Sequence, residues 1–329
     1  MSPERDVALD RAGIILKKSI LKSKKGNGKA YIALTATCLL WGTTWVASKV
    51  AVTQVPALQL AYIRQFLAGS CFLIYFMLFK KHPLPSIKDL KSIFVMSVLT
   101  MVFANGLSTW GLKYIPTGLA SLIGSLFPLI VVLIEWIFYK KRDVSLLTFI
   151  GLFIGIGGVG FVFYENMFAH IDSNFIFGLT LSLFAIVSWS LGTIFLSRHH
   201  LSVNPYFGMG LQMIMGCVML FIFANATHNT IPLASITSHS WSAISYLVIS
   251  GSILSFIAFI YSLKRLPTAV ASLYAYINPI VAMITASFLL KEKLTLTIVI
   301  GTIVTLIDVF LVNFSIKRDK EDLITEAEI

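Results

Sequence analysis

Long apolar runs separated by short polar connections dominate the pattern of this chain. The runs cover residues 31–52, 58–79, 92–112, 117–138, 145–163, 175–196, 206–225, 241–262, 268–289 and 295–315. A helix rises about 1.5 Å per residue, so about 20 apolar residues cross a hydrocarbon core of roughly 30 Å. The pattern therefore predicts an all-α integral membrane protein with ten transmembrane helices.

One stretch occurs twice. Residues 110–128 read WGLKYIPTGLASLIGSLFP, and residues 261–279 read YSLKRLPTAVASLYAYINP. Aligned without a gap, the copies share eight residues: Leu112/Leu263, Lys113/Lys264, Pro116/Pro267, Thr117/Thr268, Ala120/Ala271, Ser121/Ser272, Leu122/Leu273 and Pro128/Pro279. The repeat predicts a basic tail at 1–29, five-helix copies at 30–164 and 175–315, and a charged tail at 316–329.

The number of helices in each copy decides how the copies are oriented. Because five is odd, the second copy enters the membrane from the opposite face, which makes the two copies inverted repeats. This architecture is typical of secondary transporters, which bind substrate near the membrane midplane where the halves meet. Duplication also builds scaffolds that transport nothing, and that alternative stays open.

Composition supports the membrane prediction, with 57% hydrophobic and 12% charged residues against roughly 25% charged in soluble domains. The loops assigned inside hold ten cations (Lys80, Lys81, Lys88, Lys91, Lys140, Lys141, Arg142, Arg198, Lys264 and Arg265), and those assigned outside hold three (Lys113, Lys291 and Lys293). This asymmetry predicts that both termini are cytoplasmic. The net charge of +11 thus reflects contact with the lipid bilayer, and without interleaved aromatic residues it does not indicate nucleic-acid binding.

Two segments carry a family resemblance. The run LLWGTTWVASKVAV, followed by VPALQLAYIRQFLAG, resembles the opening of EamA-type proteins of the drug/metabolite transporter superfamily, on Trp41, Gly42, Lys49, Pro56 and Arg64. In the second copy, Pro267, Ala271, Pro279 and Glu292 also fall on the family pattern, so the resemblance covers about residues 31–315.

The resemblance implies a ten-helix fold with cytoplasmic termini and export of metabolites such as amino acids. It also implies that helices one, three, four, six, eight and nine surround a central cavity. The first copy departs from the second at one point, because Tyr139, Lys140, Lys141 and Arg142 stand where the second copy has Glu292.

Two cations lie inside apolar runs near the face predicted to be outside. Lys49 and Arg64 have no acidic residue in the outer half of either run, and ionisable groups within spans suggest function by default. We expect them to bind an anionic group such as a substrate carboxylate, with Arg64 binding it bidentately. Alternatively, both side chains extend to the headgroups or hold backbone carbonyls at a helix end.

Pro128 and Pro279 lie at matching positions in the fourth and ninth predicted helices. Each removes one backbone hydrogen bond, and helices broken at matching positions are a pointer to a transporter binding site. We therefore expect both to kink helices that line the cavity, although a kink without ligand contact is an alternative.

Polar and aromatic side chains cluster at membrane depth around those prolines. As a set they suit a cavity for a small amphipathic or aromatic substrate, while each alone is compatible with an interhelical contact. The candidates for substrate binding besides Lys49 and Arg64 are Trp41, Thr44, Asn105, Trp110, Ser121, Trp189, Tyr261, Tyr274 and Asn278, with Ser108 and Ser125 beside them.

Glu135 and Asp308 are the acids within the predicted spans. Asp308 suits either a coupling proton or an interhelical hydrogen bond. Glu135 suits an ion pair with Lys140 or Lys141. The GIGGVG run at 155–160 matches a dinucleotide-binding fingerprint, but that motif requires a soluble βαβ unit. Within an apolar run it predicts close helix packing, either inside one chain or in a homodimer.

Enzymatic functions find little support. The six histidines and three cysteines have no metal-ligand spacing, and neither a phosphate-binding loop nor a nucleophile elbow is present. We expect a protein that is not an enzyme, has no cofactor and lies in a bacterial inner membrane, where it exports small metabolites, first among them aromatic or hydrophobic amino acids. The alternatives are a multidrug exporter of lipophilic cations and a membrane-embedded lipid-modifying enzyme.

Overall fold

The computed structural model describes residues 28–139, 150–162 without 152, 156 and 159, 172–199, 201–266, 270 and 274–307. Within these ranges the chain is helical, with short turns and no strands. Asp308, Lys140–Arg142 and most of the two tails lie outside the described residues, as do Pro267 and Ala271 of the family pattern.

The first copy contains α2 (Gly28–Val52), α3 (Ala57–Ile74) with η1 (Tyr75–Phe79), and α4 (Ile87–Met96) with η2 (Ser97–Gly106) and α5 (Leu107–Gly111). It continues with α6 (Thr117–Ser125), α7 (Phe127–Tyr139) and a helix at Phe153–Val162. Pro56 and Pro116 directly precede α3 and α6, because proline fits the start of a helix, where its missing N–H costs nothing.

The second copy contains α9 (Ser173–Arg198), α10 (Pro205–Ala226), η3 (Leu233–Ser235), and α11 (Ser238–Tyr246) with η4 (Leu247–Leu254) and α12 (Ser255–Leu263). It ends with α14 (Tyr274–Leu290) and a helix at Leu296–Ile307. The side chains of Asp172, Asn204 and Thr237 accept backbone N–H bonds at the starts of α9, α10 and α11, which are the contacts expected of N-caps.

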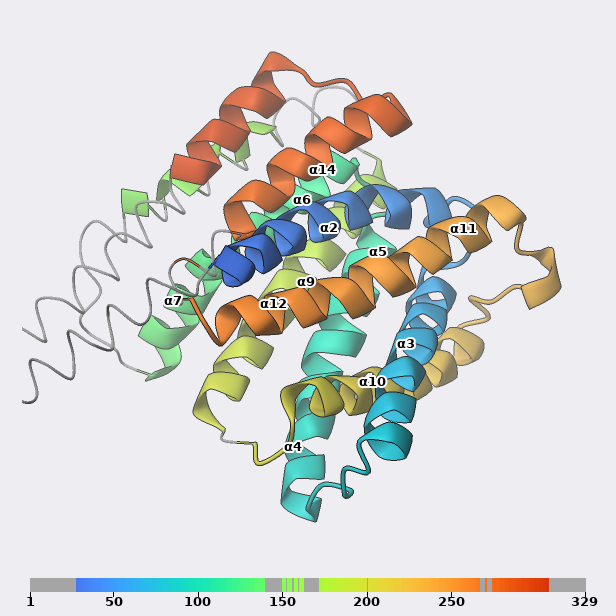
Figure 1. The fold of residues 1–329 in the computed structure, drawn as a ribbon. Helices are drawn as coiled ribbons and strands as arrows, with labels where there is room; N and C mark the ends of the chain where they lie inside the picture. The colour runs from blue at the N-terminus through green and yellow to red at the C-terminus, as the bar shows by residue number, and fades with distance from the viewer. Residues whose placement is uncertain are drawn as a thin grey trace, which may run out of the picture.

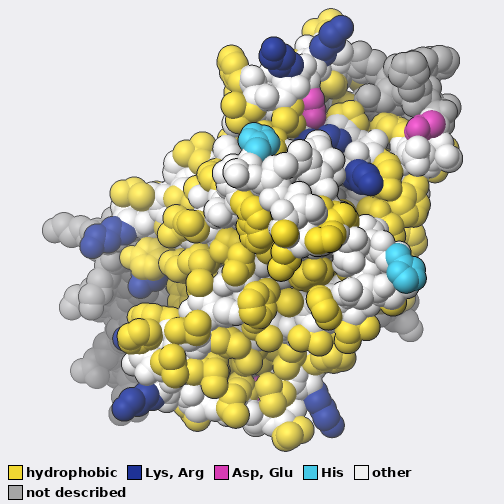
Figure 2. All heavy atoms as spheres, turned by 90° about the vertical axis from the view of Figure 1, so that its right-hand side faces the viewer, with side chains coloured by type: hydrophobic (Ala, Val, Ile, Leu, Met, Phe, Trp, Pro, Cys, Tyr) yellow, Lys and Arg dark blue, Asp and Glu magenta, His cyan; other side chains and the backbone are white. Residues whose placement is uncertain are grey.

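Seven described helical stretches are long and apolar enough to cross a membrane, namely Gly28–Val52, Ala57–Phe79, Ile87–Gly111, Thr117–Phe138, Ser173–Arg198, Pro205–Ala226 and Ser238–Leu263. Phe153–Val162, Tyr274–Leu290 and Leu296–Ile307 are shorter apolar helices. Hydrophobic side chains cover much of the middle of the face in Figure 2, as a lipid-facing surface requires. The molecule is therefore a multi-pass helical membrane protein.

The packing brings segments of the two copies side by side. The blue α2 lies against the orange α11 and α12 and against α14, and α3 packs along α10 (Figure 1). In addition, α9 packs against η2 and α5, and α14 packs on α6. The centre of the molecule is thus formed by helices from both copies.

Glycines allow several of these crossings. A Cβ built at Gly111 would lie 2.7 Å from the carbonyl oxygen of Gly178, and one at Gly178 would lie 2.9 Å from the carbonyl oxygen of Gly111. α5 and α9 therefore touch backbone to backbone at this point. In the GIGGVG run, a Cβ at Gly158 would lie 2.9 Å from the Gly301 oxygen, so this glycine packs inside the chain.

Helices three and eight share an unusual local geometry. The π-helical segments η2 and η4 begin at Ser97 and Leu247, which are almost equivalent positions of the sequence repeat. Their carbonyl oxygens accept side-chain donors from neighbouring helices: Leu99 from Ser188, Met101 from Gln65, and Gly251 from Trp41. Such segments are frequent at functional sites.

Candidate functional site

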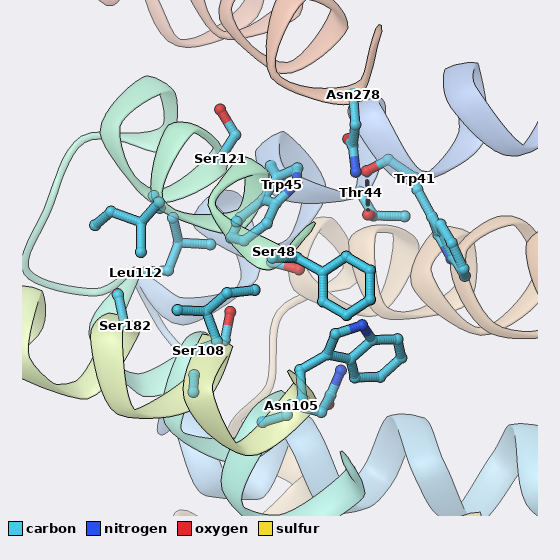
Figure 3. A pocket seen from close by; sticks show the side chains of 18 of the residues that line it. Trp41, Thr44, Trp45, Ser48, Asn105, Ser108, Leu112, Ser121, Ser182 and Asn278 are labelled. Carbon is cyan, nitrogen blue, oxygen red and sulfur yellow. Dashed lines mark hydrogen bonds between the residues drawn. The ribbon is translucent and has the colours of Figure 1, made fainter. Parts of the chain in front are cut away.

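A cavity of about 200 Å³ lies at the centre, where helices of both copies meet. Figure 3 shows Trp45 and Ser48 from α2, Ser108 from α5 and Asn278 from α14 around it. The lining residues are Trp41, Thr44, Trp45, Ser48, Arg64, Ala104, Asn105, Ser108, Thr109, Leu112, Ala120, Ser121, Ile123, Gly124, Ser125, Phe127, Ser182, Ala185, Ile186, Trp189, Phe256, Tyr274, Ala275, Asn278 and Pro279.

Most of the residues selected from the sequence surround this cavity. They come from the helices that the family resemblance implies, together with Arg64 from helix two. The selected residues that line it are Trp41, Thr44, Arg64, Asn105, Ser121, Trp189, Tyr274, Asn278 and Pro279. Lys49, Trp110, Tyr261 and Pro128 are not among the lining residues.

Trp110 and Tyr261 make contacts elsewhere. The Trp110 ring packs edge-on against Phe177, with ring centroids 5.5 Å apart. The Tyr261 ring lies under the Arg265 guanidinium, whose Cζ is 3.7 Å from the ring centroid. In this conformation both rings serve packing and cation–π contacts, not the cavity.

The two prolines differ in their helices. Helix four is interrupted where α6 ends at Ser125 and α7 begins at Phe127, directly before Pro128. Pro279 lies inside the continuous helix α14 and is buried at the cavity wall. The matching positions therefore contribute differently. Pro128 follows a break whose flanking residues, Ser125 and Phe127, line the cavity, whereas Pro279 is itself part of the lining.

Sequence reasoning missed several lining residues, although the signals were present. Trp45 and Ser48 lie four and seven residues after Trp41, which places all three on one face of α2. Ser182 precedes Trp189 by seven residues on α9 in the same way. Phe256 is the repeat equivalent of Asn105, with an offset of 151 residues, and the repeat alone could have identified it.

One end of the lining is aromatic. The Trp41 ring contacts Phe256 with centroids 5.3 Å apart, Tyr274 at 5.1 Å and Phe259 at 5.1 Å. Hydroxyl and amide groups occupy much of the remaining wall. An aromatic wall beside polar groups suits a small amphipathic molecule.

Arg64 is the charged residue of the lining. Its Nε donates to the Ser252 hydroxyl at 2.7 Å, and its Nη2 donates to the Gly251 carbonyl at 3.3 Å. That carbonyl also accepts from Trp41 Nε1 at 3.2 Å. The contacts hold the guanidinium against η4, within the π-helical segment.

These bonds leave part of the guanidinium for a ligand. An arginine carries five N–H donors, and two of the Arg64 donors are occupied by Ser252 and Gly251. Among the described residues no acidic side chain pairs with Arg64. The site therefore presents a positive charge and spare donors, which is the chemistry that binds a carboxylate or another anion.

Lys49 has a different role. Its Nζ donates to the carbonyls of Leu112 at 2.7 Å and Ile115 at 2.8 Å, with Lys113 at 3.4 Å. This is the alternative in which the lysine holds backbone carbonyls at a helix end. In this conformation its donors are occupied by the protein and not directed to a ligand.

The remaining charged candidates contribute little to the cavity. Glu135 Oε1 lies 3.9 Å from Arg198 Nη2, which joins α7 to α9. In the part of the chain that the structure describes, no group of three or more His, Cys, Asp or Glu side chains is arranged to hold a metal.

Comparison with known proteins gives a consistent set of matches. The model of the EamA-like transporter family matches residues 28–164 and 176–314. The chain is 27% identical to the uncharacterized transporter YoaV of Bacillus subtilis (strain 168), over 89% of this chain and 99% of that protein. It is 29% identical to the uncharacterized inner membrane transporter YedA of Escherichia coli (strain K12), over 80% and 83%. It is 30% identical to the uncharacterized transporter YvbV of Bacillus subtilis (strain 168), over 88% and 93%.

A solved structure has a similar fold. It is described only as a crystal structure of a protein, and it aligns with a TM-score of 0.62 over 87% of this chain and 98% of its own. The sequence identity is 16%, so this likeness concerns the fold alone.

Proposed function

The chain belongs to the EamA-like transporter family, and from this premise we propose that it is a secondary transporter that exports a small anionic or zwitterionic metabolite. The single observation that carries the substrate class is Arg64, a cation in the cavity wall without an acidic partner among the described residues. An aromatic or otherwise hydrophobic amino acid suits this charge together with the aromatic wall.

The proposed topology has ten transmembrane helices in two inverted five-helix repeats, with both termini cytoplasmic, in the bacterial inner membrane. The loop charges of the sequence support the orientation. The position of the cavity between elements of both copies supports transport by alternating access, in which the two halves rock around a central site.

The size of the cavity favours a metabolite over a drug. Its volume of about 200 Å³ lies below the roughly 300–1,000 Å³ of typical drug-sized pockets. A multidrug exporter of lipophilic cations is the main alternative, and the positive charge of Arg64 disfavours it. A lipid-modifying enzyme would need catalytic polar groups at one membrane face, whereas the polar groups here surround a central cavity, and the relatives are described as transporters.

Uptake by purified protein in liposomes tests this function. We expect an amino acid or a related small carboxylate to accumulate in proteoliposomes and a lipophilic cationic dye not to accumulate. Parallel assays with and without a pH gradient separate proton coupling from uniport. Transport of the cationic dye together with rejection of every carboxylate would contradict the proposed substrate class.

A further inference from the structure

The turn that joins α5 to α6, residues 112–116, is held by Lys49 through its backbone carbonyls. The Lys49 ammonium group, in the last turn of α2, donates to the carbonyl oxygen of Leu112 directly after α5, at 2.7 Å, and to that of Ile115 within the turn, at 2.8 Å. Carbonyl groups at a helix C-terminus carry partial negative charge and attract a cation. Lys49 therefore ties α2 to one side of the turn.

The other side of the turn is held by an acidic residue from the second copy. Glu292, in the connection after α14, accepts from the Thr117 amide at 3.0 Å, the Thr117 hydroxyl at 2.7 Å and the Gly118 amide at 3.4 Å. These amides form the N-terminus of α6, where an anion is favoured. The carboxylate is also close enough to attract Lys49 electrostatically.

This charged clamp lies at one end of the cavity. Leu112 and Ala120, on either side of the turn, line the cavity, and so does Ser48, which directly precedes Lys49. Movement of the turn away from α2 and α14 would open that end. Because Lys49 belongs to the first copy and Glu292 to the second, the clamp also joins the two halves that must move in alternating access.

The sequence of the first copy does not repeat the acidic residue of this clamp. In the repeat alignment Lys141 stands opposite Glu292, and a lysine cannot accept hydrogen bonds from a helix N-terminus. With Trp189 placed opposite Trp41 the position opposite Lys49 is Ser197, and with Pro205 placed opposite Pro56 it is Arg198. The Ser197 hydroxyl bonds to Ile194 within its own helix, and Arg198 Nη2 lies 3.9 Å from Glu135 Oε1. The two copies therefore differ at the acidic position of the clamp.

We propose that Lys49 and Glu292 are positioning residues that close the cavity at the face predicted to be extracytoplasmic, and that this closure must break for the cavity to open outward. The inference rests on the proposed alternating-access transport. It does not depend on the identity of the substrate.

Sided labelling of a cavity cysteine tests the clamp. The reporter is Ser108→Cys in a chain whose three native cysteines, Cys38, Cys71 and Cys217, are replaced by alanine. A membrane-impermeant maleimide is applied to intact cells and, separately, to inverted membrane vesicles. We expect Lys49→Gln or Glu292→Gln to raise the rate of labelling from outside about tenfold and to lower it from inside, because loss of charged hydrogen bonds shifts the population of the two states.

Two variants separate a clamp from a general loss of structure. Lys49→Arg keeps a cation that can donate to the same carbonyls, so it should retain slow labelling from outside. Lys113→Gln removes a charge from the same turn, but its ammonium lies 5.6 Å from the Tyr114 ring centroid and should not affect the labelling. Unchanged outside labelling in both Gln variants, or equal increases from both sides, would overturn the proposal. Because the labelling assay needs no substrate, its outcome can still be interpreted if every transport assay fails.

Discussion

Replacement of Arg64 by glutamine should nearly abolish transport and weaken substrate binding by roughly 100-fold or more. The side chain contributes the charge of the cavity wall, and its spare N–H groups are the strongest donors available to an anion there. Removal of one partner of a buried charge pair costs about 2–5 kcal/mol, and each 1.4 kcal/mol is a factor of about ten in affinity. Binding can be measured on purified protein by titration calorimetry with the substrate found in the uptake screen, and transport by initial uptake rates.

The matched controls separate ligand binding from support of helix eight. Ser252→Ala removes the acceptor of Arg64 Nε and leaves the cation in place, so affinity should fall only a fewfold. Arg64→Lys keeps the charge without the planar donor pair and should bind weakly. If Arg64→Gln folds and binds substrate normally while Ser252→Ala unfolds, the arginine serves only to hold η4.

The sequence identified much of the cavity wall because polar groups at membrane depth are unfavourable unless they have a hydrogen-bond partner or contact water. Asn105, Ser121 and Asn278 would face hydrocarbon without partners unless they bordered a wet cavity or another helix, and the structure places all three at the cavity. Trp110 has the same composition signal but points to Phe177. Residue type alone does not show which face of a helix a side chain occupies. The spacing of four and seven residues from Trp41 to Trp45 and Ser48 would have identified the face of α2 that lines the cavity.

The role of Lys49 could not be read from the sequence, because its partners are backbone groups. The carbonyl oxygens of Leu112 and Ile115 accept from Lys49 only when the α5–α6 turn folds against α2. Every residue has a backbone carbonyl, so the sequence does not show which ones will be acceptors. The same holds for Arg64 and the Gly251 oxygen, which η4 presents to two side chains at once. The apolar runs predicted the helices themselves, whereas nothing in their composition indicated that helices three and eight contain π-helical segments.

Gly111 and Gly178, where α5 crosses α9, should tolerate a larger side chain less well than any other packing contact of the cavity wall. Gly178→Val should destabilise the protein by about 3 kcal/mol or more, because overpacking is costly where backbone cannot move. The new Cβ would lie 2.7 Å from Tyr114 Cβ and 2.9 Å from the Gly111 oxygen. We expect a low yield of monodisperse protein and a clear fall in Tm in detergent.

The matched control is Gly157→Val, whose Cβ would meet no atom within 4 Å. Both substitutions replace a helical glycine by the same residue, so propensity and hydrophobicity change alike, and only the crossing differs. Because α5 and α9 both contribute lining residues, Ser108 and Ser182, any Gly178→Val protein that survives should also bind substrate weakly. Equal Tm values for the two variants would mean that α9 moves away from α5 at little cost, and that the close backbone contact is not what positions this wall.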